Sequence, residues 1–185
     1  MCGRYAASAS PGELVEDFEV AEDHTGGQLT ADYNVAPTKS AAVVVNRVPR
    51  DRKEDPDATP VRQLRLLTWG LVPSWAKDRK VGSRMINARV ESVFDKPAFR
   101  RAIATRRALV PADGWFEWRR LDGGSRPLKQ PCYLTRADGD RCALAGIYEF
   151  WRDPTLDADH PDAWATLREA VNAILYIAAT GRQRA

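Results

Sequence analysis

Cysteine is scarce in this sequence: there are three, and no two of them have the C-x-x-C spacing. Such a small, odd set argues against a disulfide framework and against a structural zinc site, and it fits a reducing compartment. Apolar runs long enough to cross a bilayer are also lacking, and the first thirty residues do not have the basic-then-apolar pattern of a secretory signal. We therefore expect a cytoplasmic protein without a membrane segment, a metal or a cofactor.

Internal repeats and domain-sized linkers are missing too, and 185 residues suit a single domain. The capping-box form of Ser10-Pro11-Gly12-Glu13 predicts a helix over about residues 11–19, and a second helix is predicted over 95–105. Strands are predicted at 41–48, 61–69, 107–120 and 131–151, the last two broken by turns at Asp113-Gly114 and Asp138-Gly139. This pattern favours an α+β fold, with a curved, mainly antiparallel sheet, a barrel-like core and a few peripheral helices.

The two downstream cysteines flank the second of these turns. A two-residue turn at Asp138-Gly139 would place Cys132 opposite Ala145 rather than opposite Cys142. We interpret both cysteines as core or sheet residues.

Positive charge is concentrated in the middle of the chain. The net charge is only +3, but residues 77–120 hold twelve Lys and Arg against five Asp and Glu, a local +7 that leaves −4 for the remainder. Such segregation suits a polyanionic partner. A solvated surface explains it about equally well, because exposed turns and helix faces collect arginine freely.

Cys2 offers chemistry that no other residue type has. The small side chain at position two favours removal of Met1, which would expose an α-amine and a thiol on one residue. The amine can condense with an aldehyde to an imine, and the thiol can then close a thiazolidine ring. The alternative is an accidental cysteine on a fraying terminus. Gly3, which permits close backbone approach, and Arg4, which can bind a phosphate, favour the reactive interpretation.

Two polar groups further along the chain could assist. Glu117 shares a strand face with Trp115, and a carboxyl group among aromatic rings is desolvated, which suits proton transfer; a solvated or arginine-neutralised Glu117 explains the pattern almost as well. Asn87, Arg89 and Glu91 fall on one face if residues 85–91 form a strand. There an amide and a guanidinium could orient an amine and a phosphate, although a plain half-buried strand explains this pattern too.

Aromatic residues and prolines gather in two other segments, YNVAPT (33–38) and WGLVPSW (69–75). Tryptophan and proline at bends can stack on nucleic-acid bases or wedge between them. Such residues more often fill a core, and we expect this of Trp69, which ends a predicted strand.

Taken together, six sequence blocks resemble the SRAP family. They are CGRY (2–5), YNVAPT (33–38), WGLVPSW (69–75), INARVES (86–92), VPADGWFEW (110–118) and the region around YEFW (148–151), in one order over residues 1 to about 164. The resemblance implies a monomeric single domain in the bacterial cytoplasm or nucleoid that acts on abasic sites in single-stranded DNA. A thiazolidine at the mature Cys2 would crosslink the protein to the lesion and shield it during the DNA damage response.

The resemblance also implies a role for each matching residue. Cys2 is the nucleophile, Asn87 positions its amine, and Glu117 is the acid and base of imine and ring formation. Arg4 and Arg89 bind phosphates beside the lesion. The other expected DNA-binding residues are Asn34, Pro37, Trp75 and Trp118. Lyase-like chemistry and peptidase-like release of Met1 are further expectations.

The resemblance weakens after about residue 164. The family has a further strand there, followed by a motif resembling H-D-R-M-P whose histidine assists opening of the abasic sugar, and residues 165–185 have neither. The spacing of the apolar residues in this segment predicts a helix instead. We interpret the chain as truncated or frame-shifted after about residue 164, and we expect slow crosslinking. His24 and His160 lie in polar sequence and are expected at the surface.

Two other functions stay open on the sequence. One is non-covalent binding of single strands through arginine and tryptophan, with impaired crosslinking because the histidine motif is missing. The other is an N-terminal-nucleophile peptidase, in which the arginine and tryptophan blocks have no clear use.

Overall fold

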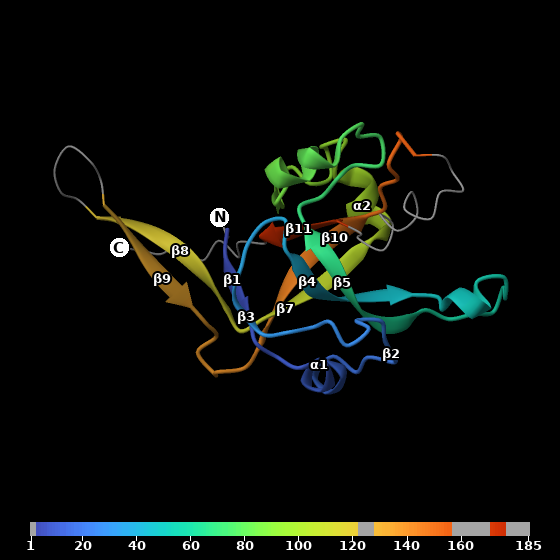
Figure 1. Cartoon of the computed structure of the whole chain (residues 1–185), viewed down its shortest axis with the longest axis horizontal. Helices are drawn as coiled ribbons and strands as arrows, with labels where there is room; N and C mark the ends of the chain where they lie inside the picture. The colour runs from blue at the N-terminus through green and yellow to red at the C-terminus, as the bar shows by residue number, and fades with distance from the viewer. Residues whose placement is uncertain (1–2, 122–127, 157–170, 177–185) are drawn as a thin grey trace.

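The computed structural model describes residues 3–121, 128–156 and 171–176. Its strands form two sheets, joined by loops and a few short helices (Figure 1). The predicted α+β fold is confirmed.

The smaller sheet has four antiparallel strands in the order β3-β1-β8-β9. Their bounds are Tyr5–Ala7 for β1, Asp32–Val35 for β3, Gly114–Leu121 for β8 and Leu128–Leu134 for β9. The N-terminal strand β1 is an interior strand, because Tyr5 pairs with Val35 on one side and with Trp115 on the other. Strands β8 and β9 extend from the body as an arm (Figure 1).

The larger sheet has seven strands in the order β2-β5-β4-β7-β10-β11-β6. Their bounds are Glu22–Asp23 (β2), Ser40–Arg47 (β4), Val61–Trp69 (β5), Asn87–Arg89 (β6), Arg107–Ala112 (β7), Cys142–Glu149 (β10) and Val171–Tyr176 (β11). The start of β11 also pairs with the end of β5, Val171 with Thr68 and Asn172 with Trp69. This pairing covers only two residues of each strand, so the sheet curves back on itself but does not form a closed barrel. The predicted curved sheet agrees with this shape.

Helices are short and peripheral. Within the described residues, the α-helices are α1 (Pro11–Asp17) and α2 (Arg100–Thr105), and the 3₁₀ helices are η1 (Arg50–Arg52) and η2 (Arg79–Arg84). The capping box of α1 is confirmed: the Ser10 hydroxyl accepts the Glu13 backbone N–H at 3.3 Å, and the Glu13 carboxylate accepts the Ser10 N–H at 2.8 Å. Helix α2 starts later than predicted because turns occupy the chain before it.

An apolar cluster joins the two sheets. Its largest members are Tyr5 of β1 and Trp69 of β5, both fully buried, whose ring centroids are 5.4 Å apart. Aliphatic side chains such as Val43 and Val110 surround them, and full burial of one such side chain contributes roughly 1.5–3 kcal/mol. The strand that carries the N-terminus is therefore packed into the centre of the molecule.

The two Asp-Gly turns connect different sheets, which corrects the predicted hairpins. Asp113 lies between β7, which pairs with β4 and β10, and β8, which pairs with β1 and β9. Asp138-Gly139 likewise connects β9 to β10. As a result Cys132 pairs with Glu117 and not with Ala145, so that prediction is wrong. A turn signal is local, and it does not determine which strand becomes the partner.

The helix predicted for residues 165–185 is wrong over Val171–Tyr176, which form strand β11. The remaining residues of that segment lie outside the described ones. Strand β11 pairs with β10 in antiparallel fashion and with β5 and β6 in parallel fashion. A short apolar run suits an interior strand as well as a helix, and its spacing alone does not distinguish the two. The further strand that seemed to be missing is thus present.

Gly70, directly after Trp69, is a position where any side chain should destabilise the fold. Its φ is +129°, and an added Cβ would lie 2.5 Å from the carbonyl oxygen of Gly82. Gly70→Ala should therefore lower the free energy of unfolding by more than the roughly 1–3 kcal/mol typical of backbone strain alone. Chemical denaturation measures this difference.

Gly139→Ala is the matched control. Gly139 also has a positive φ, of +81°, but open space surrounds its Cβ position. Gly139→Ala should lower the free energy of unfolding only by the cost of backbone strain, because no steric clash is added. Equal destabilisation by the two substitutions would contradict the close approach of Gly70 to Gly82.

Candidate functional site

The smaller sheet fixes the position of the chain's N-terminal residues. Tyr5 pairs with Trp115, and the backbone N–H of Phe116 donates to the carbonyl of Arg4 at 2.9 Å. Continued by one residue beyond the Arg4–Phe116 bond, this antiparallel register would bring Gly3 level with Glu117. Cys2 lies outside the described residues, and it is bonded to Gly3.

Glu117 lies on β8 between polar and aromatic neighbours. Its side chain is half-buried and its Oε1 atom is shielded from solvent. Because side chains alternate along a strand, Glu117 and the half-buried Trp115 share one face, as predicted, while Trp118 is on the opposite face and 45% exposed. Across the strand pair, Cys132 occupies the position directly opposite Glu117. The carboxyl group is therefore at the boundary between the core and the surface.

Asn87 reaches the same region from the larger sheet. It starts β6, which pairs with β11, and its Oδ1 atom is shielded from solvent. The carbonyl of the preceding residue, Ile86, accepts a hydrogen bond from the indole N–H of Trp69 at 2.8 Å. The Trp69 ring packs against Tyr5. One indole thus links the segment before Asn87 to the N-terminal strand.

The predicted strand around Asn87 is shorter than expected. Arg89 ends β6 and is exposed, but Glu91 follows in a turn. The expected common face of Asn87, Arg89 and Glu91 is therefore wrong for Glu91. The strand ends early because turns begin at once, with the Ser92 N–H donating to the Arg89 carbonyl at 3.1 Å.

The expectation that Trp69 fills the core is confirmed, and two other tryptophans are exposed. Trp75 and Trp118 are 63% and 45% exposed, whereas Trp69 is fully buried. Both exposed indoles are thus free to contact a partner, whereas Trp69 belongs to the core.

The predicted residues of the β3–β4 region lie beside the N-terminal strand. Asn34 is exposed on β3, which pairs with β1, and Pro37 is half-buried in the loop that follows. The loop is held at both ends: Lys39 donates to the Asp32 carboxylate at 2.6 Å and to the Asn34 carbonyl at 3.1 Å. Thr38 donates its backbone N–H to the Trp69 carbonyl at 2.8 Å. Trp69 therefore contacts this loop as well.

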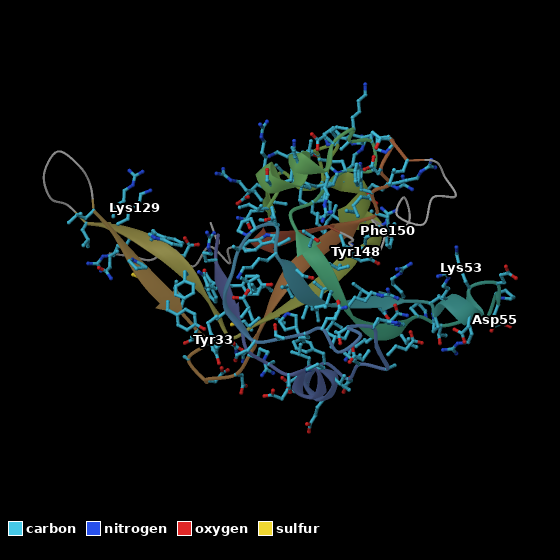
Figure 2. All side chains as sticks on the ribbon, in the orientation of Figure 1. Tyr33, Lys53, Asp55, Lys129, Tyr148 and Phe150 are labelled. Carbon is cyan, nitrogen blue, oxygen red and sulfur yellow. The ribbon has the colours of Figure 1, made fainter. Side chains whose placement is uncertain are left out.

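Basic side chains are exposed along the middle of the chain. From Lys77 to Arg107 they lie on η2, β6, α2, the start of β7 and the turns between these elements: Lys77, Arg79, Lys80, Arg84, Arg89, Lys96, Arg100, Arg101 and Arg107. On the arm, Arg119 and Arg120 are exposed beside Trp118. Figure 2 shows side chains projecting from the body and along the arm, where it labels Lys129. The positively charged part of the sequence thus exposes most of its basic residues, and these exposed lysines and arginines are called the basic surface below.

The YEFW block contributes to a largely buried polar cluster that no sequence pattern predicted. Glu149 is 5% exposed and pairs with Arg106 at 2.9 Å, and the guanidinium groups of Arg47 and Arg106 lie 4.8 and 5.8 Å from the Phe150 ring centre. Figure 2 labels Tyr148 and Phe150. Burial raises the pKa of the Tyr148 phenol above its usual value, against the opposing effect of the nearby arginines.

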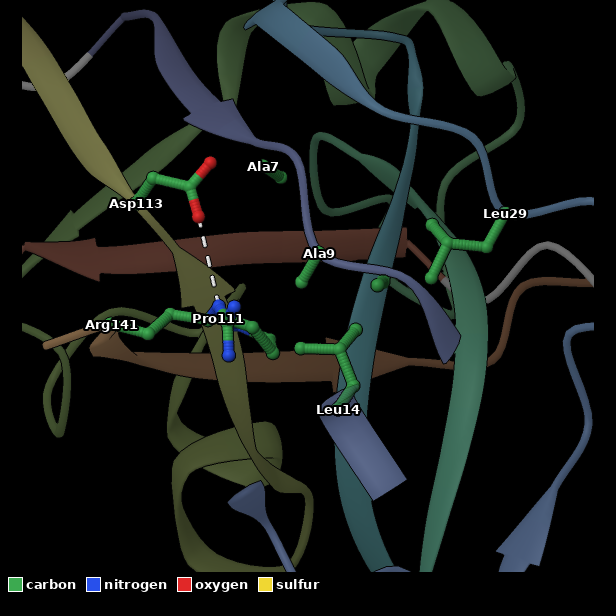
Figure 3. Close-up of a pocket in the computed structure, with 8 residues that line it drawn as sticks. Ala7, Ala9, Leu14, Leu29, Pro111, Asp113 and Arg141 are labelled. Atoms are coloured by element: carbon green, nitrogen blue, oxygen red, sulfur yellow. Dashed lines mark ion pairs between the residues drawn. The ribbon is translucent and has the colours of Figure 1, made fainter. Parts of the chain in front are cut away.

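A small pocket beneath α1 is separate from these residues. Figure 3 shows its lining, which is mostly apolar and includes the ion pair between Asp113 and Arg141, 3.6 Å long. Arg141 also pairs with Asp17 and, at 3.6 Å, with Glu13. These contacts hold α1 against the point where the chain changes sheets. We assign the pocket a structural role, because none of the predicted site residues line it.

His24 is exposed and its ring lies 3.0 Å from the Glu22 carboxylate, so the surface prediction is confirmed for it; His160 lies outside the described residues. Among the residues that the structure describes, no three metal-binding side chains gather in one place.

The arrangement of these blocks matches a known family. The model of the family described as "SOS response associated peptidase (SRAP)" matches residues 1–173. The chain belongs to the SRAP family. The match continues beyond residue 164, where the resemblance in sequence weakens, and it takes in the start of β11.

Several relatives of this SRAP chain carry names. It is 36% identical to "Abasic site processing protein YoaM" of Bacillus subtilis (strain 168), over 82% of this chain and 60% of that protein. It is 28% identical to "Abasic site processing protein HMCES" of Gallus gallus, over 83% of this chain and 53% of that protein. The chain thus spans about 60% of the length of the Bacillus relative.

Solved structures share the SRAP fold. A protein from Bacteroides thetaiotaomicron superposes with a TM-score of 0.70 at 22% identity, covering 94% of this chain and 67% of that one. A phage-related protein from Bordetella bronchiseptica gives a TM-score of 0.55 at 28% identity, over 94% and 68%. Within the described residues, no helix of this SRAP chain is long and apolar enough to span a bilayer.

The β3–β4 loop of the SRAP domain should loosen in acid. The hydrogen bond from Lys39 lowers the pKa of Asp32 below its ordinary value, and the Asn34 N–H adds to this against the effect of burial. A lowered pKa means that Asp32 stabilises the fold fully above the pKa of an unfolded aspartate, and that this is lost as pH falls through the folded value. The Asn34 amide NMR shift should therefore titrate below the ordinary aspartate range.

Lys39→Met should move that titration towards the ordinary range, and Asp32→Asn should remove it. A midpoint at or above the ordinary value in the unsubstituted protein would contradict the loop geometry.

Proposed function

We propose that this protein captures abasic sites in single-stranded DNA covalently, through the amine and thiol of the mature Cys2, and so shields the lesion during DNA repair. The observation that carries the proposal is the strand register of β1 and β8, which brings Glu117 level with the residue bonded to Cys2. The names of the relatives, abasic site processing proteins, support the same substrate.

The proposed reaction links one protein to one sugar. The Cys2 amine attacks the aldehyde of the ring-opened abasic sugar, and loss of water gives an imine. The thiol then adds to the imine carbon while its proton passes to the nitrogen, which closes a thiazolidine. Glu117 supplies and removes the protons, since its carboxyl group lies at the edge of the core. Asn87 orients the amine through its side-chain amide.

The basic surface provides the path for the strand. Arg4 and Arg89 bind the phosphates on either side of the lesion, and the wider set of exposed arginines and lysines attracts the backbone. The exposed rings of Trp75 and Trp118 stack on flanking bases, with Pro37 and Asn34 beside them. An arrangement of this kind suits single strands, because a base must be unstacked before a tryptophan can cover it.

A peptidase that acts on other proteins is less well supported. The family description includes the word peptidase, and removal of Met1 would be one such reaction. A basic surface with exposed indoles has no use in binding a general peptide substrate. We therefore restrict the peptidase-like step to maturation of this chain's own N-terminus.

Covalent capture is tested with an abasic single-stranded oligonucleotide on a denaturing gel. We expect a shifted band whose intact mass equals protein without Met1 plus DNA minus one water. Cys2→Ala should abolish the band, and Glu117→Gln should slow its formation by roughly 10²–10⁴-fold. Reduction of the sugar aldehyde to an alcohol beforehand should also prevent it.

Cys132→Ser is the matched control, because Cys132 lies directly opposite Glu117 but has no part in the proposed reaction. It should crosslink like the unsubstituted protein. A salt-sensitive gel shift that survives Cys2→Ala, with no denaturant-stable band, would establish the non-covalent binder instead.

Stacking on the arm gives a separate prediction. Trp118→Ala should weaken binding of undamaged single strands roughly 5- to 150-fold, since one base–indole stack contributes about 1–3 kcal/mol. Fluorescence anisotropy at fixed salt measures the change. Leu128→Ala on the neighbouring strand removes a side chain that is 66% exposed but has no ring, and it should leave the affinity unchanged. An equal loss of DNA affinity in both variants would contradict the stacking role of Trp118.

A further inference from the structure

Two buried tryptophans make the same kind of hydrogen bond in different parts of the molecule. The indole N–H of Trp69 donates to the Ile86 carbonyl at 2.8 Å, and that of Trp151 donates to the Ala76 carbonyl at 2.6 Å. Both side chains are almost completely buried, at 0% and 3% exposure. In each case the carbonyl belongs to a residue directly beside a proposed site residue.

Trp69 holds the segment that leads into Asn87. Its ring packs against Tyr5 of the N-terminal strand, and its backbone exchanges hydrogen bonds with the β3–β4 loop, donating to Lys39 at 2.9 Å and accepting from Thr38 at 2.8 Å. Three chain segments therefore meet on one residue. The Ile86 carbonyl ties Asn87 to that common point.

Trp151 holds the turn that presents Trp75. The turn is closed by the Ala76 N–H, which donates to the Pro73 carbonyl at 2.9 Å, and Trp75 projects from it with 63% of its side chain exposed. Ala76 itself is buried in a second apolar cluster together with Trp151. An exposed indole gains a fixed direction when the residue after it is anchored in this way.

The two contacts should serve different steps. Removing a donor from a buried carbonyl leaves that carbonyl to be desolvated without a partner, so the chain around it shifts to find one. A shift at Ile86 would move Asn87, which acts in the chemistry. A shift at Ala76 would move Trp75, which binds a base.

We infer that Trp69 and Trp151 are positioning residues with different roles. Trp69 holds Asn87 in position for the chemical step, and Trp151 holds Trp75 in position for binding of the DNA strand. The inference rests on the proposed function for its kinetic consequences. Neither tryptophan touches DNA in this assignment. Each acts through one hydrogen bond to the backbone.

Phenylalanine at either position removes the N–H and keeps an aromatic ring, so Trp69→Phe and Trp151→Phe are matched to each other. The crosslinking rate constant is measured at saturating abasic DNA in single turnover. The Kd is measured with an oligonucleotide containing a tetrahydrofuran residue, which has no aldehyde. Both are taken at a temperature where circular dichroism shows each variant to be folded.

Trp69→Phe should lower the saturated rate constant roughly tenfold to a hundredfold, as for a misplaced catalytic group, with the Kd within twofold. Trp151→Phe should raise the Kd by roughly fivefold or more, as for a lost base stack, and change the saturated rate constant less than twofold. A purely structural role would change both quantities together in each variant, or neither. Either of those results overturns the inference.

The side-chain amide resonances of Asn87 provide a readout that does not depend on any reaction. Trp69→Phe should shift them and Trp151→Phe should not. If the unsubstituted protein forms no crosslink, the proposed function fails, but these resonances and the Kd still decide the positioning roles. If the Asn87 resonances do not shift in Trp69→Phe, the role of Trp69 in positioning Asn87 is refuted.

Discussion

The pairing of β1 with strands on both of its sides is the constraint on which the rest of the site depends. A terminal segment usually frays, because few contacts hold it. Here Tyr5 lies between Val35 and Trp115, and its ring is buried against Trp69. Backbone hydrogen bonds and apolar burial act together on the same three-residue strand, and this is what gives the third residue of the chain a defined neighbour.

The proposed site takes its residues from both sheets. The smaller sheet contributes Glu117 beside the N-terminal residues, and the larger sheet contributes Asn87 through β6. The sheets are covalently joined at Asp113, whose carboxylate accepts the Ser8 N–H at 2.7 Å and lies 3.6 Å from Arg141. A change in this joint would tilt one sheet against the other. Partly buried residues outside the proposed site thereby influence how its groups face one another.

Sequence patterns predicted the local features of this protein well. The capping box at Ser10, the strands ending near Arg47 and Trp69, and the burial of Trp69 all follow from short-range chemistry. Turn signals at Asp113-Gly114 and Asp138-Gly139 marked where strands end. Which strands then pair is decided by packing over the whole chain, so the predicted hairpins were wrong.

The prediction of a helix where β11 lies was wrong for a related reason. Its apolar residues satisfy helical spacing, and only the free hydrogen-bonding edges of β10, β5 and β6 make the extended form the better one. The positions of Asn87 and Glu117 relative to β1 likewise could not be predicted from the sequence alone. They depend on a register, and a register is a property of two strands.

The arm formed by β8 and β9 also affects how the protein associates with other chains. Strand β9 is the outer strand of the smaller sheet among the described residues, so one of its edges offers unpaired backbone groups. Pro131 near its middle has no N–H to donate, and Lys129 places a charge close by. An edge interrupted in this way is a poor template for another strand. The arm can therefore extend into solvent with exposed rings and still resist sheet-to-sheet aggregation.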